Sequence, residues 1–188
     1  MRNVGIAAVV VLGGAFGYSA LFGDDDSSGS DETSGEEDTT TTVPESTEPP
    51  TTAPVDTSAF SNPEAAAAVI ERGAPEPEPP PAETPADALE VSTLIEGEGD
   101  PGTADDGYVV MYYGLQPDGT VLDESWSAAP FPIEPPLAQA SLIEGWKQGL
   151  VGAKVGERRR LVLGENNAYP GEGPLAFEID ILDITRAG

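Results

Sequence analysis

The chain has 188 residues, enough for one modest domain with additional sequence. It carries 34 acidic and 8 basic residues, a formal net charge of −26, which argues against a nucleic-acid or anionic-membrane partner because both need a basic footprint. Cysteine and histidine are absent, which excludes disulfides, thiolate nucleophiles, zinc–thiolate centres, imidazole metal sites and histidine-dependent triads. No cofactor or metal is expected, and any chemistry must use carboxylates, hydroxyls, amides or the shape of a site.

An uncharged apolar stretch occupies residues 4–22. As a helix at about 1.5 Å per residue it would span roughly 28 Å, close to the thickness of the bilayer hydrocarbon core. Arg2 precedes it and acidic residues 24–26 follow it, which orients the N-terminus toward the cytoplasm. Residues 1–23 are therefore predicted to be a transmembrane anchor, with the C-terminal domain outside the cell membrane. The alternative is a cleaved secretory signal with its apolar core at residues 4–12, and both interpretations export the rest of the chain.

Residues 24–87 are rich in acidic residues, Pro, Thr and Ser and have little to bury, so a disordered linker is predicted. Within it, residues 62–72 carry the start and body of a short Ala-rich helix, and Gly73 marks its end. Such a helix is marginal in water on its own, and it either docks on the domain or stays nascent in the tether. The Pro-rich residues 74–85 should be extended and semi-rigid.

Residues 88–188 are predicted to form a compact α+β domain. Its expected strands are residues 89–95, 108–115, 121–125, 158–163 and 175–184, the last a half-buried antiparallel strand from its strict period-two alternation. Phe131 and Ile133 alternate with prolines, which favours an edge strand or an extended loop. About five strands and one short helix imply a curved antiparallel sheet wrapped over that helix.

The expected helix begins near Ser141, which forms a predicted capping box with Glu144. Its apolar stripe centres on Trp146, and Gly152 suits the left-handed residue that ends a helix. The helix is about ten residues long, so tertiary packing must hold it. The three arginines at 158–160 are interpreted as surface residues that balance charge.

An ordered set of motifs resembles the FKBP-type peptidyl-prolyl cis/trans isomerases over most of residues 88–186. The most specific part is Ile143-Glu144-Gly145-Trp146 followed by Gly149 and then by residues 154–158, Lys-Val-Gly-Glu-Arg. The other matching pieces are Val109-Val110-Met111-Tyr112-Tyr113-Gly114, Asp118-Gly119, Leu122-Asp123-Glu124-Ser125, Phe131, Ala168-Tyr169 and Leu175-Ala176-Phe177. The resemblance implies the FKBP-like fold for this region and does not extend to residues 1–87.

The resemblance also implies a substrate pocket of aromatic and aliphatic side chains with the Trp146 indole as its floor. The Asp123 carboxylate would lie near the mouth, while the Ile143 backbone N–H and the Tyr169 hydroxyl would donate hydrogen bonds to substrate carbonyls. Leu122 stands where the family commonly has Phe. The other positions that match the pocket walls are Tyr112, Phe131, Leu142, Ile143, Tyr169 and Phe177.

The function that the resemblance implies is isomerisation of Xaa-Pro bonds in extracytoplasmic proteins, as folding assistance. Rotation about such a bond meets a barrier of ~18–20 kcal/mol, and a dry apolar pocket can favour the twisted amide without a nucleophile. Expected partners are proline-containing polypeptide clients, macrolide ligands, and the membrane through the N-terminal helix, with no nucleic acid. A proline-binding module or holdase with little turnover is the alternative, because the loop of residues 170–174 after Tyr169 is short. A third hypothesis has the pocket bind the chain's own proline-rich tether.

Overall fold

The computed structural model describes residues 55–188, and these fold around one antiparallel sheet. The six strands are β1 (Leu89–Ile95), β2 (Gly107–Leu115), β3 (Val121–Glu124), β4 (Phe131–Ile133), β5 (Arg158–Leu163) and β6 (Leu175–Thr185). The strand order is β1-β5-β6-β2-β3, with β4 also paired to β2. The predicted antiparallel sheet with a short helix on it is confirmed, and the piece that was left open as an edge strand or a loop is the sixth strand.

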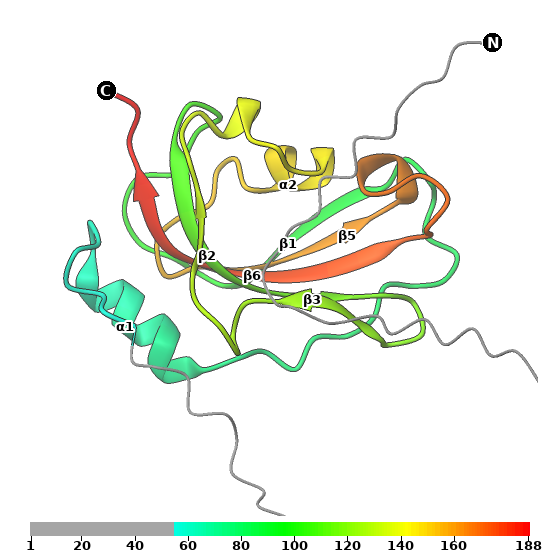
Figure 1. Ribbon diagram of the computed structural model, residues 1–188, viewed down its shortest axis with the longest axis horizontal. Coiled ribbons are helices and arrows are strands. Elements are labelled where there is room, and N and C mark those ends of the chain that lie inside the picture. Colours follow the sequence, from blue (N-terminus) through cyan, green and yellow to red (C-terminus); the bar gives the residue numbers. More distant parts are fainter. Residues whose placement is uncertain (1–54) are drawn as a thin grey trace, which may run out of the picture.

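Two helices cover the two faces of this sheet (Figure 1). The helix α2 (Glu144–Gly149) lies over one face, where Trp146 and Leu150 join the main hydrophobic core. The helix α1 (Pro63–Arg72) lies against the other face and forms a second, smaller core. Single turns of 3₁₀-helix occur at Leu137–Gln139 and Glu165–Asn167.

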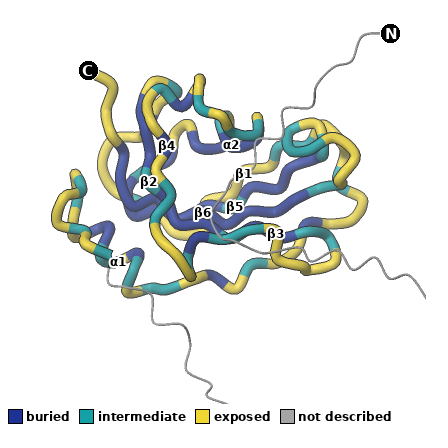
Figure 2. Tube along the Cα trace, in the orientation of Figure 1, coloured by how far each residue is buried: buried dark blue, intermediate teal, exposed yellow. Residues whose placement is uncertain are grey.

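Because both faces are covered, the inner strands are buried on both sides (Figure 2). In β6, every residue from Leu175 to Ile184 is buried. The prediction of a half-buried strand here was therefore wrong. The outer face of β6 is buried because Met111 and Leu182 pack against Ala66 and Val69 of α1 in the second core.

The helix α1 is where the sequence predicts one, and the structure selects the docked alternative. The Asn62 side chain caps it by accepting a hydrogen bond of 3.1 Å from the Ala65 backbone N–H. Ala65, Ala66 and Val69 are buried on its inner side. At its end, Arg72 forms an ion pair of 3.1 Å with Asp180 of β6.

The proline-rich segment after α1 continues against the same domain. The Gly73 carbonyl accepts a hydrogen bond of 2.7 Å from Arg158, and the Pro79 carbonyl accepts one of 3.2 Å from Arg160. Pro75 and Pro80 are buried. Residues 55–87, the described part of the predicted linker, are thus packed structure and not a disordered tether.

The helix α2 is shorter than expected and is not capped as predicted. Ile143 is its N-cap residue, and no side chain makes a capping hydrogen bond. The predicted capping box was wrong because Ser141 lies two residues before the N-cap, and Glu144 pairs with Lys147 instead. Gly152 has φ +83°, which confirms the expected left-handed residue after the helix.

The interpretation of the arginines as surface residues was wrong for two of the three. Arg158 and Arg159 are buried, because β5 is an inner strand between β1 and β6. The Arg158 Nε donates to both Asp180 oxygens at 2.9 and 3.0 Å, and Arg159 pairs with Glu157 at 2.7 Å. Burial of these cations requires such partners, since an unpaired buried charge is costly.

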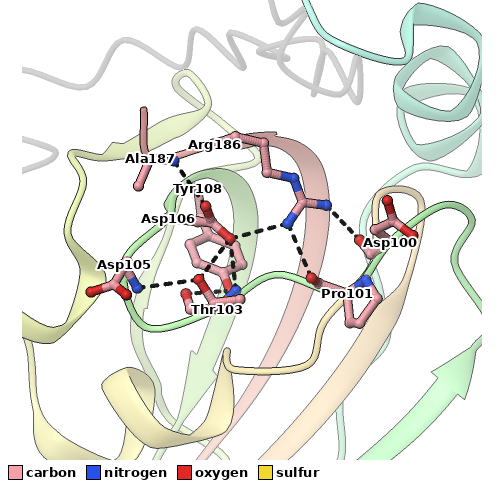
Figure 3. Close-up of polar contacts among 8 residues, drawn as sticks. All are labelled: Asp100, Pro101, Thr103, Asp105, Asp106, Tyr108, Arg186 and Ala187. Carbon is pink, nitrogen blue, oxygen red and sulfur yellow. Dashed lines mark hydrogen bonds and ion pairs between the residues drawn. The ribbon is translucent and has the colours of Figure 1, made fainter.

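A polar clamp attaches the C-terminal end of the chain to the loop before β2 (Figure 3). The Asp106 carboxylate accepts hydrogen bonds from the Thr103 backbone at 2.8 Å, the Ala187 backbone at 2.9 Å and the Arg186 guanidinium at 3.0 Å. Arg186 also donates to the Asp100 carbonyl at 2.7 Å. The Ala187 backbone hydrogen bond, with those from Thr103 and Arg186, lowers the pKa of Asp106 to about 2, against the opposing effect of burial.

Within residues 55–188, no helix is both long and apolar enough to cross a membrane. The predicted anchor at residues 1–23 and the linker up to residue 54 lie outside the described residues.

Candidate functional site

Four aromatic rings from four different elements meet above the sheet. Tyr112 of β2 lies 5.1 Å from Trp146 of α2 and 5.8 Å from Phe131 of β4, between ring centroids. Trp146 lies 5.4 Å from Phe177 of β6 and 6.3 Å from Phe131. All four pairs meet edge to face, the arrangement that aromatic quadrupoles favour. We call these four rings the aromatic cluster.

Glycines allow the rings to come this close. Gly114 lies opposite Phe177 in the β2–β6 register, and a Cβ there would be 2.7 Å from the Phe177 ring. In α2, a Cβ at Gly145 would be 2.5 Å from the Leu163 side chain of β5. Both distances are too short for a real side chain, so the glycines set how Phe177 and Trp146 are held against the sheet.

The cluster is mostly buried, and half-buried side chains pack beside it. Trp146, Phe177 and Tyr112 are only 4%, 4% and 3% exposed, as expected for the floor of a site and also for a closed core. The half-buried residues packed against this core include Phe131, Leu142, Ile143 and Tyr169. The structure therefore packs these predicted wall residues against the core that contains Trp146.

Leu122 is the exception among the predicted wall residues. It is exposed and does not belong to the side chains that pack on the main core within residues 55–188. The family-typical aromatic wall at this position is thus absent, and nothing apolar among those packed residues comes from the β2–β3 turn.

Asp123 of β3 lies beside the cluster. Its Oδ2 accepts a hydrogen bond of 2.6 Å from the Tyr112 hydroxyl, and its Oδ1 accepts one of 2.9 Å from the Glu124 backbone N–H. Burial, the hydrogen bond to Asp123 and the nearby negative charges raise the pKa of Tyr112. Burial and the Asp123 charge likewise raise the pKa of Tyr169. Both phenols therefore remain protonated at neutral pH and keep their capacity to donate hydrogen bonds.

The loop after Tyr169 is a tight turn. Gly171 and Gly173 have φ values of +91° and +83°, which side chains rarely adopt. The Tyr169 carbonyl accepts a hydrogen bond of 3.1 Å from the Glu172 backbone N–H, and the Glu165 carboxylate accepts one of 2.8 Å from Gly171. These bonds close the short connection to β6 and leave no long flap above the cluster at this point.

Two features of the site region were not expected from the sequence. One is a hollow of about 200 Å³ beside Tyr112 and Phe131, for which the small residues Ser125, Ala128 and Ala129 were the signal. The other concerns the proline-rich segment: Pro75 and Pro77 lie near Tyr113 on β2. Successive strand residues point to opposite faces, so these prolines lie across the sheet from Tyr112. The hypothesis that the pocket binds the chain's own tether is wrong for this segment.

The described residues offer no cluster of three or more carboxylates that could hold a metal ion. The site is thus built from rings, one carboxylate and phenolic and backbone hydrogen-bonding groups. Such groups can bind a peptide and orient it through hydrogen bonds.

Comparison with known proteins decides the family. A sequence profile of FKBP-type peptidyl-prolyl cis-trans isomerases matches residues 101–182. FK506-binding protein 1A of Neurospora crassa is 31% identical over 108 residues, which cover 52% of this chain and 89% of that protein. The chain belongs to the FKBP-type family.

Two further relatives are longer proteins of this family. Peptidyl-prolyl cis-trans isomerase FKBP11 of Bos taurus is 32% identical over 117 residues, 56% of this chain and 57% of that protein. A probable FKBP-type 25 kDa isomerase of Pseudomonas aeruginosa is 40% identical over 101 residues, 49% of this chain and 42% of that protein. The chain thus spans about half the length of these relatives. The profile match contains the whole aromatic cluster and Asp123, and it leaves α1 outside.

Proposed function

We propose that this protein catalyses cis/trans isomerisation of Xaa-Pro bonds in polypeptide clients, at the aromatic cluster. The observation that carries the proposal is the convergence of Tyr112, Phe131 and Phe177 on the buried Trp146, beside the Asp123 carboxylate, in a member of this family. The proline ring would lie over the indole, with half-buried Leu142 and Ile143 beside it.

The physical basis is preferential binding of the twisted amide. The planar peptide bond is held by resonance, which gives the barrier of ~18–20 kcal/mol. The twisted state loses that resonance and its charge separation, so an apolar floor stabilises it relative to the ground state. Trp146 Nε1 has no hydrogen-bond partner within residues 55–188, and the floor carries no charge.

Three groups are assigned to orient the substrate. The Tyr169 hydroxyl, kept protonated by its raised pKa, donates to a substrate carbonyl, and the Ile143 backbone N–H donates to another. The Asp123 carboxylate holds the Tyr112 hydroxyl and faces the carbonyl carbon of the rotating bond. These roles need positioning and no covalent step.

A protease-coupled assay on Xaa-Pro peptides tests the proposal with the full chain. Asp123→Asn and Tyr169→Phe should lower kcat/KM, and Trp146→Leu should lower it further, while exposed Glu134→Gln serves as the matched control. Near-UV circular dichroism checks that each variant is folded. If the unmutated chain does not accelerate isomerisation, catalysis at this site is refuted.

The second candidate is a proline-peptide-binding module or holdase with little turnover. The hydrogen-bonded short turn after Tyr169 favours it, because a more open site holds its substrate less firmly. Peptide binding that changes Trp146 fluorescence without faster isomerisation would select this candidate. Macrolide binding is proposed for the same site, since several relatives are named FK506-binding proteins.

We further propose that the chain acts outside the cytoplasm, attached to the membrane by residues 1–23 or secreted after cleavage there. The support is the uncharged apolar stretch with its flanking charges. Protease accessibility of the domain on intact cells tests the location. Protection of the domain until the cells are lysed would contradict it.

A further inference from the structure

A hollow of about 200 Å³ adjoins the aromatic cluster on the side of the β3–β4 connection. It is smaller than a typical small-molecule pocket of ~300–1,000 Å³, so its size suits a single side chain. Two rings of the cluster, Tyr112 and Phe131, form one wall of it. The remaining lining residues come from the end of β3 and the loop that follows: Glu124, Ser125, Ala128, Ala129 and Pro130.

The only charged group in this lining is Glu124. The loop positions its carboxylate, because the Ser127 backbone N–H donates to it at 2.9 Å and the Ser127 hydroxyl donates to its other oxygen. The Ser125 hydroxyl is already used, since it accepts from the Tyr112 backbone N–H at 3.0 Å. Each Glu124 oxygen accepts one hydrogen bond from Ser127 and keeps a further lone pair that a ligand could use.

No cation in the described part of the chain neutralises Glu124. Residues 55–188 contain 24 acidic and 7 basic residues, a net of −17. Six of the seven bases form ion pairs with other carboxylates, and Asp123 and Glu124 are in none of these pairs. Burial and Asp123 are the main causes of the raised pKa of Tyr112, and the nearby Glu124 charge adds to them.

We propose that this Glu124 hollow binds a lysine or arginine side chain of the client close to the isomerised proline, which makes the protein selective for basic Xaa-Pro segments. The inference rests on the proposed isomerase function. The rings and the methyl groups of Ala128 and Ala129 suit the aliphatic stem of such a side chain. The ring faces attract its cationic head, and the Glu124 carboxylate accepts its hydrogen bonds. The net negative charge of the domain adds steering toward basic segments.

The test uses the full chain and Xaa-Pro peptides that differ at one position flanking the proline, with lysine, its neutral analogue norleucine, or glutamate there. The readout is the ratio of kcat/KM for the lysine and norleucine peptides at low and high salt. We expect a ratio of about 3 to 10 at low salt, the range of one partly exposed charged hydrogen bond. Glu124→Gln should bring the ratio close to one, and the control Glu134→Gln should leave it unchanged.

A second variant separates the hollow from the general field of the domain. Ala128→Leu fills the hollow and keeps every charge, so it should also remove the lysine preference. A ratio of one in the unmutated chain overturns the inference, as does an equal loss of preference in Glu124→Gln and Glu134→Gln. If the chain accelerates no peptide, the isomerase proposal fails, and binding of the same peptides measured by calorimetry still tests the hollow with the same variants and the same outcomes.

Discussion

The replacement Val69→Ala tests whether α1 is part of the folded domain. Val69 is fully buried in the second core, against Met111 and Leu182. The change removes two carbons, about 1.6 kcal/mol at ~0.8 kcal/mol for each, and it leaves a cavity that adds to the loss. We expect the free energy of unfolding to fall by about 2 kcal/mol.

The choice of alanine makes the result decisive. Alanine is the best helix former, so in an undocked helix Val69→Ala would strengthen α1 and leave the domain unchanged. Urea unfolding followed by tryptophan fluorescence measures the difference through the midpoint concentration. The matched control is Glu71→Ala, an exposed position of the same helix, which should change little.

Equal stability of the Val69→Ala and Glu71→Ala variants would refute the docking of α1. The isomerase rate provides an independent check, because α1 lies on the face of the sheet opposite the aromatic cluster. A folded Val69→Ala variant should therefore retain the rate of the unmutated chain. A large loss of rate with unchanged stability would mean that α1 acts on the site and not on the fold.

Three further changes test other parts of the structure. Arg158→Met removes one of the two cations that pair with the buried Asp180, and because Arg72 remains it should cost about 1.5–3 kcal/mol of unfolding free energy at pH 7; a loss below about 0.5 kcal/mol would contradict the buried pair. The folded-state pKa of Asp106, about 2 against 3.8 when unfolded, contributes about 2 kcal/mol above pH 5 that is lost as the pH falls toward 2. Asp106→Asn should remove this pH-dependent part, so a stability difference from the unmutated chain that stays constant between pH 2 and 6 would disprove it. Gly114→Ala places a methyl group 2.7 Å from the Phe177 ring and should reduce kcat/KM while the chain stays folded; an unchanged rate would show that the ring position is unimportant.

Most strands of the domain were predictable because segments rich in β-branched, aromatic or alternating apolar residues lie between turn signals. The register that brings Gly114 opposite Phe177 could not be predicted, because it depends on an irregularity in the β2–β6 pairing. Family resemblance supplied what periodicity could not, namely that Tyr112, Trp146 and Phe177 meet in one cluster. It also places Leu122 in the pocket wall, and that side chain is exposed in the structure.

The docking of α1 was left open because a short Ala-rich helix has too little apolar surface to predict whether it packs against the domain. The signal lay in the sheet instead. Met111 and Leu182 point away from α2, so a second apolar face on β2 and β6 needed a cover. Their burial by Val69 shows that the cover comes from a segment whose composition resembles a linker.

The charges of the domain could be counted from the sequence, but their pairing could not. Arg158 and Arg72 converge on Asp180 from β5 and α1, a buried arrangement that only the tertiary fold creates. This arrangement joins the helix outside the family match to a strand inside it, because α1 lies before residue 101 and Asp180 lies within residues 101–182. The folded unit of this protein therefore extends beyond the family match, and six of the seven cations in residues 55–188 form ion pairs within it. The carboxylates beside the aromatic cluster consequently keep their charge uncompensated, which is the condition that a preference for basic clients requires.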